Sequence, residues 1–292
     1  QILEDAKVPV ENVLGEVGKG HKIAFNVLNV GRFKLGAVAT GAAKAAFVEA
    51  LKYARTRRQF GVPIGTFGAI REKIADMAAY IFASESLVYR LAGMIDDRLA
   101  TIPKDRPDYY EAYQQGIEEY AVECSISKVF CTDMLAQVVD EVLQVHGGYG
   151  FVQEYPAERF YRDERVNRIY EGTNEINRSL IAGTLLKRLT KQGERFVQEV
   201  RKAREAMKGP SAGGADASRP FSGEETVLRN LKHVFLAIAG TAVETYGDRI
   251  KDKQEILMAL ADVAANIFAV ESAVARGVKI DPSLSPAGRE NV

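Results

Sequence analysis

The chain has 292 residues, enough for one large domain or two smaller ones, and 47% of them are hydrophobic, which suffices to fill a core. Its 39 basic and 39 acidic residues balance, which argues against a nucleic-acid-binding protein, because such proteins concentrate an excess of Lys and Arg. Cys124 and Cys131 fall on one predicted helix, too far apart along its axis for a disulfide, and indicate a reduced, cytosolic protein. No Cys, His and Asp residues have the spacing of metal ligands, so no metal site is expected.

Four long helices are predicted in the first two thirds of the chain. Residues 1–20 contain Pro9 and several glycines and are interpreted as an extended linker with a turn. Apolar residues then recur at helical spacing over residues 21–57, 67–99, 108–145 and 173–189, with a short helix near 157–163. Because few stretches favour strands, this pattern predicts an all-α fold, with an antiparallel four-helix bundle over residues 21–192. No apolar run reaches the length of a membrane span, and no signal peptide is apparent.

A change of composition predicts a domain boundary near residue 208. Residues 208–223 read KGPSAGGADASRPFSG, which is typical of a flexible linker, so residues 193–223 are interpreted as the end of a connecting helix followed by this linker. Two more helices are predicted over residues 224–246 and 251–278. They form a smaller C-terminal helical extension that covers residues 224–292.

One segment of the bundle recurs in this extension. Residues 74–90 read IADMAAYIFASESLVYR, residues 260–276 read LADVAANIFAVESAVAR, and 11 of the 17 aligned positions are identical. We interpret the recurrence as a partial duplication whose second copy packs like the first. Chance similarity between two alanine-rich helices is the alternative, although the identical pairs include residues other than alanine: Asp76 and Asp262, Phe82 and Phe268, Glu85 and Glu271, Arg90 and Arg276.

Residues 170–176, with the sequence YEGTNEI, place an acidic side chain on a short turn before a helix. Glu171 and Gly172 form the turn, and the helix is predicted to begin at Thr173 or Asn174. A carboxylate held over a cleft can take a proton from a bound substrate, and the glycine allows close backbone approach. By spacing alone, the simpler interpretation is a glutamate that complements the helix dipole.

Four ordered motifs decide between these interpretations. They are VPVENVLG at 8–15, YARTRRQFG at 53–61, QVHGGYG at 144–150 and YEGTNEI at 170–176. Together they resemble the C-terminal part of the acyl-CoA dehydrogenase family, with the very-long-chain branch as the nearest. The resemblance implies that residues 1–20 end a preceding β domain, and that the chain is a fragment of a longer protein. It also implies oxidation of a long-chain acyl-CoA to the trans-2-enoyl-CoA, as in fatty acid β-oxidation, with Glu171 as the catalytic base.

A second position in the family tests the choice of base. Some branches carry the base on the first long helix, directly before an arginine that matches Arg32. Gly31 occupies that position here and cannot act as a base, which supports Glu171. The resemblance also assigns residues to the substrate and to FAD. The substrate residues are Asn29, Arg32, Tyr170 and Gly172, and the cofactor residues are Arg57, Gln59, Phe60, Gln144, Gly147, Gly148, Thr173, Asn174 and Glu175.

Several of these assignments have simpler alternatives. Arg57 could belong to a solvated helix end, and Gly147 and Gly148 could only stop a helix. Gly68 stands where many relatives have glutamine, which puts one FAD contact in doubt. In relatives the flavin ring is held mainly by the β domain, so the chain alone is expected to bind FAD weakly and to be inactive.

The resemblance further implies a homodimer or tetramer, because FAD contacts cross between subunits in the family, and an electron-transfer flavoprotein as electron acceptor. The expected location is the cytoplasm in a bacterium or the mitochondrion in a eukaryote. The extension implies either a peripheral membrane contact or an enlarged subunit interface. Two other functions remain open from the sequence: a non-catalytic scaffold for dimerisation or membrane docking, and an acyl-CoA oxidase.

Overall fold

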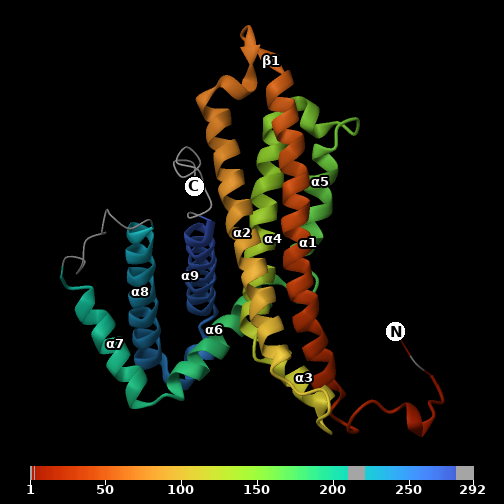
Figure 1. Cartoon of the computed structure of the whole chain (residues 1–292), viewed down its shortest axis with the longest axis vertical. Helices are drawn as coiled ribbons and strands as arrows, with labels where there is room; N and C mark the ends of the chain where they lie inside the picture. Colours follow the sequence, from red (N-terminus) through yellow and green to blue (C-terminus); the bar gives the residue numbers. More distant parts are fainter. Residues whose placement is uncertain (1, 3, 210–220, 281–292) are drawn as a thin grey trace.

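The computed structural model describes residues 2, 4–209 and 221–280, and these residues are largely helical (Figure 1). The helices are α1 (Gly20–Thr56), α2 (Gly68–Ala100), α3 (Tyr109–Glu118), α4 (Ala121–His146), α5 (Ala157–Glu164), α6 (Asn174–Thr190), α7 (Glu194–Ala206), α8 (Ser222–Tyr246) and α9 (Gln254–Ile280). Two-residue strands, β1 (Arg58–Gln59) and β2 (Val62–Pro63), pair antiparallel at the tip beyond α1. The prediction of an all-α fold is confirmed.

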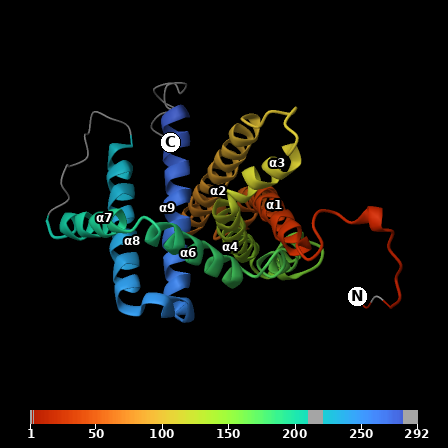
Figure 2. The same cartoon turned by 90° about the horizontal axis from the view of Figure 1, so that it is seen from below.

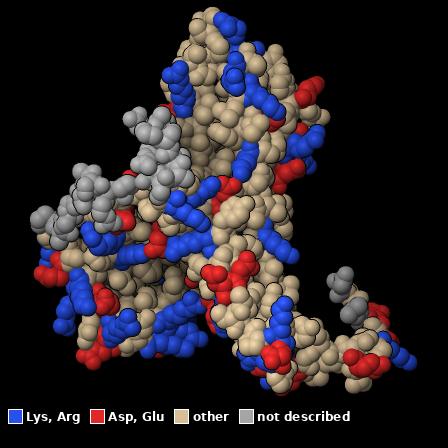
Figure 3. Space-filling model, in the orientation of Figure 1, with Lys and Arg blue, Asp and Glu red and all other residues tan. Residues whose placement is uncertain are grey.

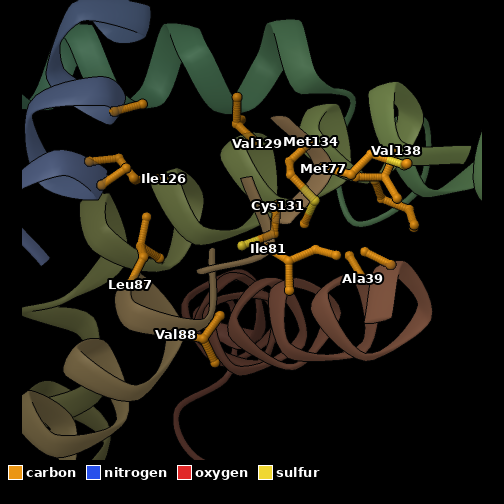
Figure 4. Close-up of a cluster of buried hydrophobic side chains, with 14 of the residues drawn as sticks. Ala39, Met77, Ile81, Leu87, Val88, Ile126, Val129, Cys131, Met134 and Val138 are labelled. Atoms are coloured by element: carbon orange, nitrogen blue, oxygen red, sulfur yellow. The ribbon is translucent and has the colours of Figure 1, made fainter. Parts of the chain in front are cut away.

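The long helices α1, α2 and α4 lie side by side and enclose the main core (Figures 1 and 4). A stripe of small side chains on α1 lets α4 approach closely, since alanine adds little bulk between two helix axes. These residues recur at helical spacing and are fully buried: Ala39, Ala43, Ala46, Ala50 and Ala54. Larger side chains from α2 and α4, among them Met77, Leu87 and Val138, fill the space around them (Figure 4).

The contact between α1 and α4 is tight at Gly36. A Cβ atom added at this residue would lie 2.2 Å from Oγ of Ser127 and 3.0 Å from the backbone oxygen of the same residue. Ser127 is fully buried, so the serine side chain and the α4 backbone would both have to shift.

Gly36→Ala is therefore expected to destabilise the fold by about 1–3 kcal/mol, as overpacking of a core does. Gly41→Ala, on the same helix but with no atom within 4 Å of the added Cβ, is the matched control. It is expected to stabilise the chain by about 0.5–1 kcal/mol, because alanine favours helix over glycine. Urea unfolding of both variants measures the difference, and equal stabilities would contradict the close packing.

The helix predicted over residues 108–145 is wrong as a single element, because the structure has two helices there. α3 ends at Glu118 and α4 begins at Ala121. Gly116 of α3 packs tightly on the end of α2, where an added Cβ would lie 3.1 Å from Leu99 and 3.4 Å from Ile102. This close contact gives α3 a separate direction from α4. Residues 193–209 also differ from the prediction, since they contain the separate helix α7, while residues 210–220 lie outside the described part.

The C-terminal helices form a second group beside the bundle, with α6 running between the two (Figures 1 and 2). α6 packs against α4 on one side and α9 on the other, and α9 also contacts α2 and α8. Among the described residues, one helix is long and apolar enough to cross a membrane, which the sequence did not predict: α9, with a mean hydropathy of 1.6. Such helices are also common in protein cores. Here α9 packs on α2, α4, α6 and α8 and carries Asp262, Glu271 and Arg276, all three in ion pairs.

Candidate active site

Glu171 and Gly172 adopt backbone angles that few residues other than glycine accept. Their φ values are +59° and +79°. A non-glycine residue in the left-handed region is strained by roughly 1–3 kcal/mol, and such strain persists only where surrounding contacts impose it. The turn leads directly into α6, whose N-cap Thr173 accepts a hydrogen bond from the Ile176 backbone at 3.3 Å.

Three buried side chains from three helices hold this turn by its carbonyl groups. Asn177 of α6 donates to Gly172 O at 2.7 Å and to Thr173 O at 3.0 Å. Lys128 of α4 donates to Gly172 O at 2.9 Å, and Arg32 of α1 donates to Glu171 O at 3.3 Å. The backbone of the turn is therefore held by hydrogen bonds from α1, α4 and α6.

One oxygen of the Glu171 carboxylate has no hydrogen-bond partner among the described residues. This atom, Oε2, is buried. The same atom points at α1, where a Cβ added to Gly31 would lie 2.5 Å from it. Buried carboxylate oxygens are normally hydrogen-bonded, and an exception in a strained turn is typical of a functional group. The arrangement suits a base that takes a proton from a bound molecule.

Lys128 and Asn174 form a buried network beneath the turn. Nζ of Lys128 also donates to Oδ1 of Asn174 at 2.5 Å, and Nδ2 of Asn174 donates to Asp133 at 2.8 Å. The side chain of Asn174, a residue that the resemblance assigns to FAD, points into the bundle and is only 3% exposed. Thr132 completes the network by donating to Lys128 O at 2.7 Å.

Lys128 makes the stability of the fold depend on pH. Burial lowers the pKa of its ammonium group from 10.5 to about 8. Between these pH values the unfolded chain retains a proton that the folded chain has lost, so this residue adds stability as the pH rises from about 8 to 10.5. Relative to Lys128→Met, the free energy of unfolding of the parent is expected to increase by on the order of 3 kcal/mol across that window. Urea titrations of both proteins at several pH values measure it, and parallel curves would contradict it.

Arg32 and Asn29, the predicted substrate residues on α1, are buried in the structure. Arg32 Nη1 donates to Oδ1 of Asn29 at 3.4 Å and to Oγ of Ser125 at 3.5 Å. Burial lowers the pKa of the Arg32 guanidinium below its usual value, partly offset by Cys124 and by Glu171. Arg32 contacts the Glu171 turn directly, and Asn29 accepts a hydrogen bond from Arg32. Tyr170, in contrast, is half-exposed, and its hydroxyl donates to Asn167 at 2.9 Å.

A second group of predicted residues lines an open cavity of about 520 Å³ at the other end of the bundle. It contains Arg57 and Gln59, from the segment after α1, and Gly147 and Gly148, from the end of α4. Aromatic rings form its walls: Tyr53 stacks on His146 with centroids 4.3 Å apart, and the Arg57 guanidinium lies 5.3 Å from the Tyr149 ring centroid. The cavity thus combines a permanent cation, stacking surfaces and exposed backbone.

The remaining predicted cofactor residues lie outside this cavity lining. Gln144 and Glu175 are exposed, and Thr173 caps α6. Phe60 is 93% exposed at the tip of the β1–β2 turn. Sequence reasoning missed Lys128, Asn177 and Tyr53. The one visible signal was Lys128 itself, a single lysine inside the otherwise apolar or small-residue stretch 124–132 of α4.

The chain resembles known proteins over the part that contains both the Glu171 turn and the cavity. The family described as "Acyl-CoA dehydrogenase, C-terminal domain" matches residues 18–186, and a second family of the same description matches residues 230–289. A solved acyl-CoA dehydrogenase from Bacillus anthracis, complexed with FAD, superposes with a TM-score of 0.92 at 44% identity, over 99% of this chain and 49% of that one.

Three relatives show the range of similar proteins. The "Probable acyl-CoA dehydrogenase" of Bacillus subtilis is 43% identical over 95% of this chain and 47% of its own length. A subunit of the caffeyl-CoA reductase–Etf complex of Acetobacterium woodii is 40% identical over 64% of this chain and 44% of its own length. The mouse very-long-chain acyl-CoA dehydrogenase is 41% identical over 61% and 24%. The chain spans less than half the length of each relative, and it belongs to the acyl-CoA dehydrogenase family.

Proposed function

We propose that the protein containing this chain oxidises an acyl-CoA thioester to the trans-2-enoyl-CoA, with Glu171 as the base. The observation that carries the proposal is the partnerless, buried Oε2 of Glu171 on a turn fixed from three sides. In this reaction Glu171 takes the α proton, the β hydrogen leaves as hydride, and a carbon–carbon double bond forms. The missing side chain at Gly31 leaves room for the carboxylate itself, since a Cβ there would lie 2.5 Å from Oε2.

The open cavity at the far end of the bundle fits part of an FAD molecule. Arg57 offers a forked, permanently charged donor to a pyrophosphate, and Gly147, with φ +59°, lets backbone approach the ligand. Tyr53, His146 and Tyr149 supply ring surfaces for a nucleotide base. Bound FAD would supply the acceptor for the hydride. Gly68 has no side chain to replace the glutamine contact of many relatives, and no atom lies within 4 Å of its Cβ position.

The distance between the two clusters supports an oligomer. Gly31, beside the base, and Tyr53, in the cavity, lie 22 residues apart on α1, which corresponds to about 33 Å along the helix. One chain's cavity therefore does not adjoin its own base. We propose a homo-oligomer in which the cavity of one chain, with the exposed Phe60 near its rim, completes the flavin site of another. The likeness to an Etf-complex subunit supports an electron-transfer flavoprotein as the partner that reoxidises the enzyme.

For the substrate we propose a long-chain acyl-CoA, on the likeness to the mouse very-long-chain enzyme and the presence of the C-terminal helices. Anaerobic titration of the complete flavoprotein with acyl-CoAs of increasing chain length tests this. Bleaching of the oxidised flavin that is fastest with the longest chains is the expected result.

Two other results would overturn parts of the proposal. Bleaching that favours short or aryl-substituted thioesters would replace the long-chain assignment while keeping the reaction. A complete protein that assembles but neither holds flavin nor bleaches would favour a scaffold.

A further inference from the structure

The two copies of the sequence repeat pack directly against each other. Residues 74–90 lie on α2 and residues 260–276 lie on α9, and the two helices run antiparallel at this contact. Arg90 of the first copy pairs with Glu271 of the second at 2.8 Å. Arg276 of the second copy pairs with Glu85 of the first, also at 2.8 Å. Because Glu85 corresponds to Glu271, and Arg90 to Arg276, the two ion pairs are the same contact made twice.

The aromatic and hydroxyl contacts repeat in the same way. The guanidinium of Arg90 lies 4.9 Å from the ring centroid of Phe268, and that of Arg276 lies 4.5 Å from Phe82. The same two guanidinium groups reach serine hydroxyls of the opposite copy, at 3.4 Å from Ser272 and 3.5 Å from Ser86. Each contact made by one copy has its counterpart in the other, as in a two-fold interface between identical molecules.

The correspondence extends to the helices that precede each copy. Glu85 accepts a second hydrogen bond from Lys44 of α1 at 2.6 Å, and Glu271 accepts one from Lys232 of α8 at 2.5 Å. Each glutamate therefore lies between a lysine on the helix that precedes its own copy and an arginine of the other copy. Acidic and basic side chains accordingly alternate where the C-terminal helices meet the bundle (Figure 3).

The residues that make these contacts are identical in the two copies. They occupy four positions: Phe82 and Phe268, Glu85 and Glu271, Ser86 and Ser272, Arg90 and Arg276. A position away from the interface differs, since the exposed Tyr89 corresponds to Ala275. Identity at all four contact positions favours a duplication over chance similarity between alanine-rich helices.

We infer that α2 carries a self-complementary face, formed by Phe82, Glu85, Ser86 and Arg90, that fits the α2 helix of a second copy of this chain, and that α9 covers this face as an internal copy. A second α2 helix brings the same four side chains in the same order, so placed where α9 lies it would form the same ion pairs and ring contacts. While α9 is docked, this face is closed to other chains. The inference does not depend on the proposed reaction.

The test releases α9 without altering α2. In the complete protein, E271R/R276E puts like charges opposite Arg90 and Glu85 and leaves the α2 face unchanged. Hydrogen exchange of residues 260–276 is expected to rise, and the mass of the assembly in sedimentation velocity is expected to at least double. The matched control adds R90A, which removes the arginine that α2 needs for self-pairing. In this triple variant the glutamate introduced at position 276 still faces Glu85 and neither original ion pair can form, so α9 is expected to be released, as the same hydrogen-exchange measurement checks, while the assembly keeps the mass of the unaltered protein.

Three results would overturn the inference. The first is release of α9 with no increase in mass, because an exposed face should then have paired. The second is an equal mass increase in the triple variant, because association would not depend on the face. The third is unchanged hydrogen exchange in E271R/R276E, because the reciprocal ion pairs would then contribute nothing to the fit of the two copies.

Discussion

Replacing Glu171 with glutamine is expected to slow flavin reduction by acyl-CoA about 1,000-fold or more in the complete protein. A positioned general base typically contributes about 10²–10⁴-fold, and an amide cannot take the α proton. The side chain keeps its size, and since Oε2 has no hydrogen-bond partner in the described chain, the substitution breaks no contact of this atom. The fold and the flavin content are therefore expected to stay unchanged.

Anaerobic stopped-flow bleaching, at saturating acyl-CoA, measures this effect directly. Glu194→Gln is the matched control, because Glu194 is an exposed glutamate at the start of α7, outside both clusters. It is expected to bleach at the parent rate. If Glu171→Gln holds flavin and also bleaches at the parent rate, Glu171 is not the base. If it loses flavin instead, the turn contributes to the cofactor site and the rate says nothing about proton transfer.

Local sequence patterns predicted the positions of α1, α2, α6, α8 and α9, because these helices have apolar faces and identifiable ends. The stop at Gly147 and the start at Thr173 are examples, since one is a glycine with positive φ and the other a hydroxyl N-cap. The break between α3 and α4 was missed because no proline or glycine separates the two helices. It depends on the packing of Gly116 against the end of α2, which is a tertiary contact.

The candidate site was predicted in its residues but not in its internal contacts. The motif around Glu171 predicts a base at this position, yet nothing in the local sequence showed that Asn174 points into the bundle or that Lys128 supports the turn. Both depend on which face of α4 meets α6. The repeat likewise indicated a duplication, and only the structure showed that the two copies contact each other.

Gly31→Ala is expected to lower the rate of flavin reduction on the order of 100-fold, because displacing a reacting group by about 1 Å can cost that much. The new Cβ would lie 2.5 Å from Oε2 of Glu171, 2.9 Å from its Cδ and 3.2 Å from its Oε1. The backbone of the turn is fixed by Asn177, Lys128 and Arg32, so the carboxylate itself must move. The same stopped-flow measurement of flavin bleaching applies, with Gly41→Ala as the control on the same helix.

The stability of Gly31→Ala shows whether the variant only displaces the carboxylate or disrupts the whole bundle. Glycine inside a helix costs roughly 0.5–1 kcal/mol relative to alanine, so a glycine at position 31 weakens α1 unless it has a function there. Gly31→Ala is therefore expected to unfold at the same or a higher urea concentration than the parent while losing activity. Loss of both would mean that the clash disrupts the bundle. Full activity would mean that the carboxylate swings freely, and that its place against Gly31 is not the position from which it takes the proton.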